Sequence, residues 1–300
     1  MAKIGLIDVE SHNFPNLALM KLSAYHKEKG DKVELIDTPI EALLGNWDKV
    51  YKSKIFTNSL DEFANISSSK VIKGGTGYDL KNKLSKEIEA IYPDYNLYSN
   101  PKFDDTAYGF LTRGCPRDCS FCIVSQKEGK CSKKVANLDQ FWRGQKKIKL
   151  LDPNLLASKD KYNLLKQLVE SRAKVDVTQG FDIRLLDDKS VELINALDLE
   201  TIHFAWDNYE FKTYKKLKKY RDKLKFNKRK LIVYVLINYN TTIEQDLERL
   251  YKLRELSYSP YVMIYDKHKL PSGDIKRRMQ RWVNNRYIWY SGVDFKDYRR

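Results

Sequence analysis

The sequence predicts an α/β protein with parallel sheets, in which a small open domain precedes a partial barrel of six strand–helix units. Two observations lead to this fold class. Short apolar runs alternate with amphipathic helical segments along most of the chain, which is the pattern of parallel β/α units. In the second half these runs recur at regular intervals, and polar residues follow each of them. Six units are too few for a full eight-stranded barrel.

Residues 1–104 are expected to form the small open domain and a connector. Residues 3–8 have the composition of a buried strand, and Pro15 opens a helix that ends at Lys29-Gly30. Further strands are predicted at 33–36, 50–56 and 71–72, and a helix within the polar connector 81–105.

Residues 105–270 are expected to form the partial barrel. Its strands are predicted at 108–112, 148–151, 175–178, 201–205, 231–237 and 261–265, and its helices at 161–172, 190–197, 211–224 and 244–256. The carboxyl ends of parallel strands share one face, where the chemistry of such barrels takes place. Residues 271–300 are expected to form a basic, aromatic helical extension that caps the open side of the barrel.

Composition indicates a soluble globular protein, because 42% of the 300 residues are apolar and 32% are charged. No apolar run approaches the roughly 20 residues that cross a bilayer, and the N-terminus lacks the layout of a signal peptide. The cytoplasm, where thiols stay reduced, is therefore the expected location. The net charge of +15 suits a polyanion such as tRNA or DNA. A genome that favours lysine codons is the alternative explanation.

Three of the four cysteines lie within eight residues, spaced C-x3-C-x2-C, after the first predicted strand of the barrel: Cys115, Cys119 and Cys122. Three thiolates around a four-iron cluster leave one iron open to bind a ligand. The alternative is a structural zinc site with Cys131 as the fourth ligand. Zinc ligands usually come as two closely spaced pairs, whereas Cys131 stands alone and is expected to be a free thiol.

This spacing, with Phe121 directly before the third cysteine and five more β/α units behind it, resembles the radical S-adenosylmethionine (radical SAM) superfamily over residues 105–270. The resemblance implies that the three cysteines hold a [4Fe-4S] cluster, whose open iron binds the amino and carboxylate groups of S-adenosylmethionine (SAM). One electron from a donor such as flavodoxin or ferredoxin then cleaves SAM to methionine and a 5′-deoxyadenosyl radical, which takes hydrogen from a substrate.

The groups of SAM predict which side chains surround it. The ammonium suits Asp152 and Asn154, the acid and the amide that follow the second strand. The carboxylate suits Arg184, beyond the third strand. The ribose suits the amides and acid Gln179, Asp182 and Asn238, and the adenine suits Phe121 as an aromatic wall. The alternative for each polar residue is to satisfy backbone groups at a strand end. The family's Gly-Gly-Glu-like turn after the second strand is absent.

Two histidines lie near predicted strand ends. His203 is interpreted as a core histidine, because it lies inside an apolar strand, and His268 as a candidate acid or base.

The N-terminal domain resembles the cobalamin-binding-like Rossmann domain that precedes the barrel in many radical SAM enzymes. The family's D-x-H-x-x-G motif, which supplies a ligand to cobalt, is not matched by Asp8-Val-Glu-Ser-His12-Asn. A degenerate domain without cobalamin is therefore expected.

A basic stretch, Lys212–Lys230, holds eleven Lys or Arg residues and one Asp, with Tyr214, Tyr220 and Phe226 between them. Cations interleaved with aromatic rings suit nucleic acids, and the helix at Arg277–Arg286 repeats the pattern; a solvated outer helix is the alternative. Three functions stay open: a radical SAM enzyme that modifies a nucleic acid or nucleotide, one that acts on a small molecule or peptide, and a non-catalytic iron–sulfur or zinc protein that binds nucleic acid.

Overall fold

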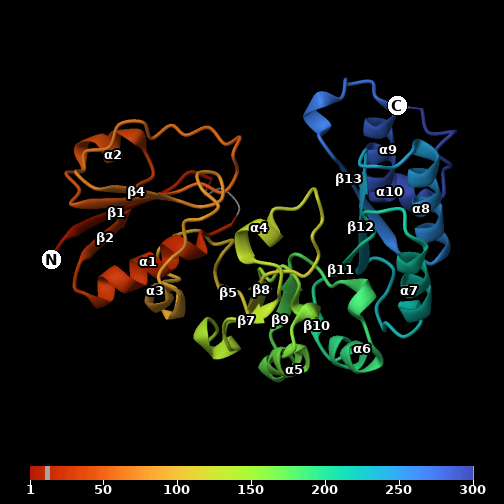
Figure 1. The fold of residues 1–300 in the computed structure, drawn as a ribbon, viewed down its shortest axis with the longest axis horizontal. Coiled ribbons are helices and arrows are strands. Elements are labelled where there is room, and N and C mark those ends of the chain that lie inside the picture. The colour runs from red at the N-terminus through yellow and green to blue at the C-terminus, as the bar shows by residue number, and fades with distance from the viewer. Residues whose placement is uncertain (11–13, 300) are drawn as a thin grey trace.

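The computed structural model describes residues 1–10 and 14–299, and its elements follow one another in blocks across Figure 1. The chain is an α/β protein with parallel sheets, as the sequence predicts. Over these two ranges, no helix combines the length and the apolar character needed to cross a membrane.

The N-terminal block contains a four-stranded parallel sheet and three helices. Their bounds are β1 Lys3–Asp8, α1 Leu17–Glu28, β2 Lys32–Leu35, α2 Pro39–Leu44, β3 Lys49–Ser53, β4 Val71–Gly74 and α3 Lys86–Ala90. The strand order is β2-β1-β3-β4, so the apolar β1 lies inside the sheet. The predicted strands and α1 are confirmed. The helix α2 was not predicted, because six residues are too few to show helical periodicity.

The barrel block contains all six predicted strands, in two parallel sheets that together make the partial (β/α)6 barrel. The strands are β5 Thr106–Gly109, β8 Lys147–Leu150, β9 Lys174–Val177, β10 Asp198–Leu199, β11 Ile202–Ala205, β12 Leu231–Ile237 and β13 Ser259–Ile264. The helices between them are α5 Lys161–Ser171, α6 Asp188–Asn195, α7 Phe211–Arg221 and α8 Ile243–Glu255. The strand orders are β10-β9-β8-β5 and β11-β12-β13. The short β10 before β11 was not predicted.

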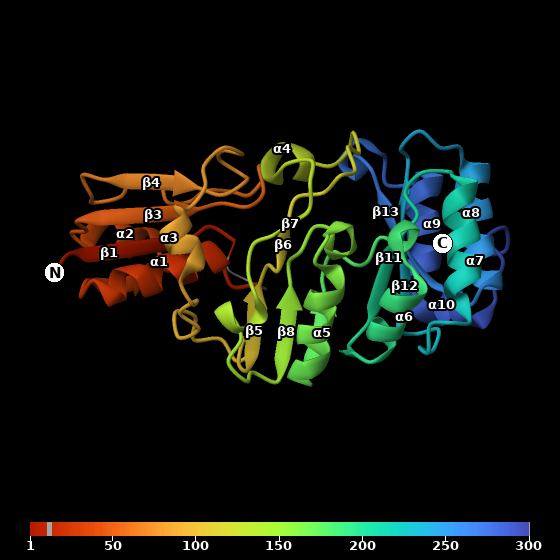
Figure 2. The same ribbon diagram turned by 60° about the horizontal axis from the view of Figure 1, so that its bottom comes forward.

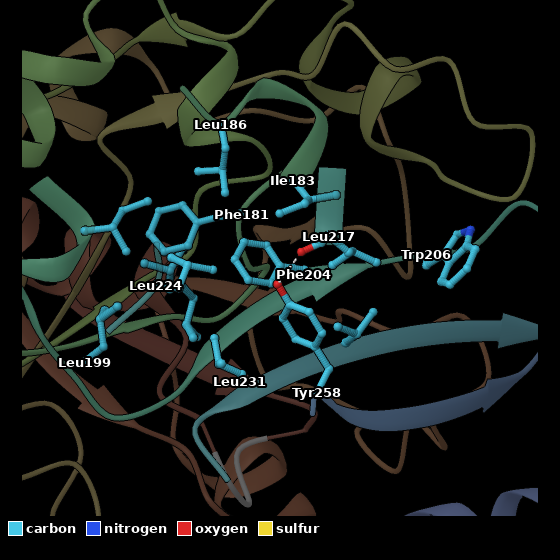
Figure 3. Packing of buried hydrophobic residues seen from close by; sticks show 14 of the residues in the cluster. Phe181, Ile183, Leu186, Leu199, Phe204, Trp206, Leu217, Leu224, Leu231 and Tyr258 are labelled. Carbon is cyan, nitrogen blue, oxygen red and sulfur yellow. Dashed lines mark hydrogen bonds between the residues drawn. The ribbon is translucent and has the colours of Figure 1, made fainter. Parts of the chain in front are cut away.

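One hydrophobic core spans both barrel sheets. The Phe181 amide, beyond β9, donates a hydrogen bond to the His203 carbonyl on β11 at 2.7 Å, which links the sheets. Figure 3 shows Phe204 of β11 facing Tyr258, whose hydroxyl donates to the Leu217 carbonyl of α7 at 3.0 Å. The outward faces of the strands are therefore buried under the helices, and the inward faces are left to line the barrel.

The C-terminal extension forms two helices, α9 Ile275–Asn284 and α10 Arg286–Ser291, instead of one. The helix is interrupted at Asn285, whose side chain accepts hydrogen bonds from amides in the first turn of α10. Helix α9 lies along the free edge of β13, where Asn284 and Gln280 hydrogen-bond the Val262 backbone at 2.8–3.0 Å. The extension thus covers the edge of the last strand and adds Trp282 to the barrel core.

The aromatic rings of the basic segments mostly point inward. Tyr220 is 2% exposed and Trp282 is fully buried, and Tyr214 and Phe226 pack against the same core. The exposed rings that base stacking needs lie at the ends of these segments instead, where Phe211 is 61% and Tyr287 is 91% exposed.

Candidate functional site

The cysteine loop is closed by a two-stranded antiparallel ribbon of β6 Thr112–Arg113 and β7 Lys133–Lys134, with the short helix α4 Val124–Glu128 inside it. Figure 2 shows α4 beyond the arrowheads of β5 and β8, at the carboxyl end of the barrel strands. The Cys115 amide donates to the Gly129 carbonyl at 3.1 Å, and the Cys122 amide to the Cys119 carbonyl at 2.9 Å. The cysteine loop therefore lies at the carboxyl face of the barrel, where the sequence predicts the functional site.

The four thiols are free and differ in exposure. Cys115 is buried, Cys119 and Cys122 are half-buried, and Cys131 is exposed. Burial raises the pKa of Cys119, and the neighbouring Cys122 raises that pKa further. The uncharged thiol is thus favoured until a metal stabilises the thiolate.

Within residues 1–10 and 14–299, no group of three or more His, Cys, Asp or Glu side chains gathers around one point to hold a single ion. A tetrahedral zinc site needs such a gathering. The thiolates of an iron–sulfur cluster bind separate iron atoms. Cys115, Cys119 and Cys122 lie on one loop, the first buried and the other two half-buried.

Asp152 fixes the start of the cysteine loop through hydrogen bonds. It is fully buried, and its carboxylate accepts hydrogen bonds from the Leu111 amide at 2.9 Å, the Thr112 amide at 2.6 Å and the Thr112 hydroxyl at 2.7 Å. Burial raises its pKa to about 6 against these hydrogen bonds. Both oxygens are engaged, so Asp152 positions the loop and does not face a ligand, in contrast to the predicted contact with SAM.

Asn154, two residues further on, does face the loop. Its amide nitrogen lies 3.5 Å from Cys115 Sγ and 3.3 Å from an Asp182 oxygen. Its Oδ1 is buried and has no hydrogen-bond partner among the residues that the structure describes. Buried acceptors without partners are rare, and a ligand with an N–H donor would satisfy this one.

Asp182 and Arg184 form one charged group next to the loop. Arg184 donates to Asp182 at 2.7 and 3.2 Å, and Arg117 of the cysteine loop donates to Asp182 at 3.0 Å. These two cations hold the pKa of Asp182 below its ordinary value although burial opposes them. Arg184 also lowers the pKa of Cys119, which places its charge near that thiol.

An aromatic contact joins the loop to the far side of the barrel. The Phe121 ring lies 5.1 Å from that of Tyr239, just after β12, and Tyr239 lies 4.9 Å from Tyr265, after β13. Ser120 hydrogen-bonds the Tyr239 hydroxyl. A cavity of about 340 Å³ opens here, lined by residues 116–121, Asn208 and Tyr239.

The two remaining candidates, Gln179 and Asn238, are not among the residues that line this cavity. Gln179 is exposed. Asn238 has a positive φ of 64° and donates to the Tyr265 carbonyl at 2.8 Å, so it shapes the turn after β12. Sequence reasoning missed Tyr239 and Asn208, although both follow predicted strands and that position was the available signal.

Arg249 of α8 is also a residue that sequence reasoning missed. Its side chain is fully buried, pairs with the buried Asp246, and donates to the carbonyls of Trp206, Asp207 and Leu236. It thus holds the carboxyl ends of β11 and β12 together. Nothing in an amphipathic helix pattern distinguishes it from a surface arginine.

The N-terminal sheet has a cavity of about 360 Å³ at the carboxyl ends of β1 and β2, and four carboxylates line it: Asp8, Glu10, Asp37 and Glu62. Burial raises the pKa of Asp8 and of Asp37. Cobalamin carries a phosphate in its nucleotide tail, and an anion is repelled by such a wall. These residues do not fit that group. His12 lies outside the described residues.

The comparisons with known proteins support the fold. No family model and no curated protein matches this sequence. Solved structures that share the fold include a radical SAM methyltransferase, so the arrangement of an open α/β domain and a parallel partial barrel is one that such enzymes use. That structure is TsrM from Kitasatospora setae with cobalamin and a [4Fe-4S] cluster bound; it matches with a TM-score of 0.65 at 12% identity, over 88% of this chain and 75% of that one.

Proposed function

We propose that this chain is a radical SAM enzyme. The observation that carries the proposal is the C-x3-C-x2-C loop at the carboxyl end of the first barrel strand, with polar residues from the next two strand ends around it. The fold it shares with a radical SAM methyltransferase supports the same conclusion.

Cys115, Cys119 and Cys122 would hold a [4Fe-4S] cluster, and Cys131 is left out because it is exposed. When bound, such a cluster supplies the electron that cleaves SAM reductively; a flavodoxin- or ferredoxin-like donor would deliver that electron. The chain's own residues position SAM and exclude water.

Three groups are suited to hold SAM. The unpaired Oδ1 of Asn154 would accept a hydrogen bond from the amino group, and Arg184 would bind the carboxylate while Asp182 fixes the orientation of Arg184. Phe121 and Tyr239 would flank the adenine. Gln179 and Asn238 are weaker candidates for the ribose, because one is exposed and the other is committed to a turn.

We propose the domain division 1–104, 105–270 and 271–300 that the sequence predicts. The last segment shares the barrel core through Met279, Trp282 and Trp289, so we expect it to fold with the barrel.

A small-molecule or peptide substrate is the better candidate than a nucleic acid. The basic segment Lys212–Lys230 remains a possible docking surface for tRNA or DNA, but its Tyr220 ring is buried. A non-catalytic iron–sulfur or zinc protein that binds nucleic acid is the second candidate function.

The test is reductive SAM cleavage by the anaerobically reconstituted full chain, with 5′-deoxyadenosine measured by mass spectrometry. Wild type and Cys131→Ser are expected to form it, and Cys119→Ser is not. Asn154→Ala is expected to weaken SAM binding about tenfold, as for the loss of one hydrogen bond to a charged group. Absence of 5′-deoxyadenosine from a wild type that holds its cluster would favour the non-catalytic alternative.

A further inference from the structure

Five barrel strands each place one polar or aromatic side chain on the inner wall: Lys149, Asp176, His203, Tyr234 and Tyr261. We call this set the barrel belt. Lys149 and Asp176 are register partners, as are Tyr234 and Tyr261. The Lys149 ammonium lies 3.9 Å from Asp176, and the His203 ring lies 5.2 Å from Tyr234, which in turn lies 5.7 Å from Tyr261. The belt therefore runs across the break between the two sheets.

Two atoms of the belt are buried without a partner. Asp176 Oδ1 and His203 Nδ1 make no hydrogen bond of ordinary geometry within the described ranges, although the Val177 backbone lies close enough to His203 to raise the pKa of its imidazole against the larger effect of burial. Burial raises the pKa of Asp176 and lowers that of His203, which favours a neutral imidazole. The other histidine nitrogen lies 2.9 Å from the Thr201 hydroxyl. Asp176 lies on β9 and His203 on β11, on either side of the break between the two sheets. Buried polar groups without partners are typical of a site that a ligand completes.

The wall beside these atoms is aromatic and open. On β13, Val262 and Ile264 lie on the outward face of the strand and are buried under the helices, whereas Tyr261 and Met263 on the inward face are 47% and 38% exposed. Tyr265 follows, and its ring contacts Tyr239 next to the cysteine loop. An apolar surface thus leads from the loop to the belt.

The charges of the belt cancel. Lys149 offsets Asp176, and His203 is neutral, in a chain whose net charge is +15. A phosphate-bearing polymer gains nothing from such a surface. A flat, uncharged ring gains stacking area on the tyrosines and a partner for the unsatisfied oxygen.

We propose that the barrel belt is the substrate site and takes a neutral planar ring with an N–H or O–H donor at its edge. The ring packs against Tyr234 and Tyr261, its donor binds Asp176 Oδ1, and a second edge group pairs with His203 Nδ1. This proposal rests on the proposed function, because it names the substrate class of that enzyme.

The test measures binding of two probes, indole and phenol, to the full chain without a cluster, by ligand-observed NMR and equilibrium dialysis. Cyclohexanol, which has the donor but no flat ring, is the control ligand. Both rings are expected to bind, cyclohexanol about tenfold more weakly, and Asp176→Leu and His203→Phe to weaken ring binding about tenfold or more. Asp188→Leu, on the exposed side of α6, is the matched control and is expected to bind as wild type does.

Thermal melting separates this role from a structural one. Asp176→Leu removes a 3.9 Å contact with Lys149 and His203→Phe removes one hydrogen bond with Thr201, so each is expected to lower the melting temperature only slightly, whereas a structural role lowers it strongly. The proposal is overturned if neither ring binds wild type, if both variants bind as wild type does, or if tRNA displaces the rings from the belt. SAM cleavage is assayed on the same proteins: normal cleavage without ring binding overturns the belt alone, and a wild type without a cluster overturns the proposed function.

Discussion

Gly114 is the position where the cysteine loop depends most directly on backbone geometry. It precedes Cys115 and has a φ of +89°, and a Cβ at this residue would lie 2.2 Å from the Cys131 carbonyl oxygen. Gly129 provides a matched control, because its φ is +93° but an added Cβ would meet nothing within 4 Å. Both substitutions place a side chain at a positive φ, which for Gly129 is combined with a ψ of 165°, a region nearly restricted to glycine. Only Gly114→Ala adds the clash with the Cys131 carbonyl.

The structure sets the size of the difference. A side chain at these positive φ values costs about 1–3 kcal/mol in either variant. Overpacking against a backbone that cannot rotate away adds about 1–3 kcal/mol at Gly114 alone. We expect Gly114→Ala to lose about 2–6 kcal/mol of unfolding free energy and Gly129→Ala about 1–3 kcal/mol. The shift that relieves the clash also moves the Cys115 amide from the Gly129 carbonyl.

Urea denaturation of the two variants and wild type gives these free energies, and iron content after reconstitution reports whether the loop still holds a cluster. Gly114→Ala is expected to retain less iron than Gly129→Ala. Equal losses of stability and equal iron content in the two variants would refute this description of the loop.

Three further predictions concern the supports of the site. Arg249→Met is expected to lose about 3–5 kcal/mol of stability in urea, because it leaves Asp246 as an unpaired buried charge; Lys252→Met, which removes a surface pair, is expected to lose less than about 1 kcal/mol. The raised pKa of Asp152, about 6 against an ordinary 3.8, means that the folded state binds a proton more tightly than the unfolded state. Wild type should therefore gain stability relative to Asp152→Asn, by about 2–3 kcal/mol, as the pH falls from 7 to 4; a pH-independent difference in urea midpoints contradicts this. Cys131→Ser is expected to bind iron as wild type does, and loss of iron there would make Cys131 a ligand.

Local patterns were sufficient to predict the strands of four or more residues, but not the two-residue strands β7 and β10. Runs such as Leu231–Ile237 are too apolar to be anything but buried, and their spacing with helices between them implies a parallel sheet. Helical periodicity alone does not show whether an aromatic side chain is buried in the core or exposed for binding. Tyr220 and Trp282 looked like partners for nucleic acid bases, and both point into the core because their positions fall on the inward stripe of α7 and α9.

At the site, the sequence predicts the loop but not the direction of each side chain around it. Asp152 and Asn154 are two residues apart at one strand end, and only the fold shows that the first binds the loop backbone and the second faces the cysteines. Long-range supports such as Arg249 depend on which helix packs behind which strand, and no local signal carries that information. The belt histidine, His203, was interpreted as a satisfied core residue, whereas its Nδ1 has no partner within the described ranges of the chain.

The central claim is that three cysteines hold a four-iron cluster with one open iron. The most direct measurement is the electron paramagnetic resonance spectrum of the reduced, anaerobically reconstituted full chain, recorded with and without SAM, together with iron and sulfide analysis. The account predicts about four iron and four sulfide per chain, and a spectrum that changes when SAM is added. About one zinc per chain with no iron–sulfur signal, or a cluster whose spectrum is unchanged by SAM, would contradict it.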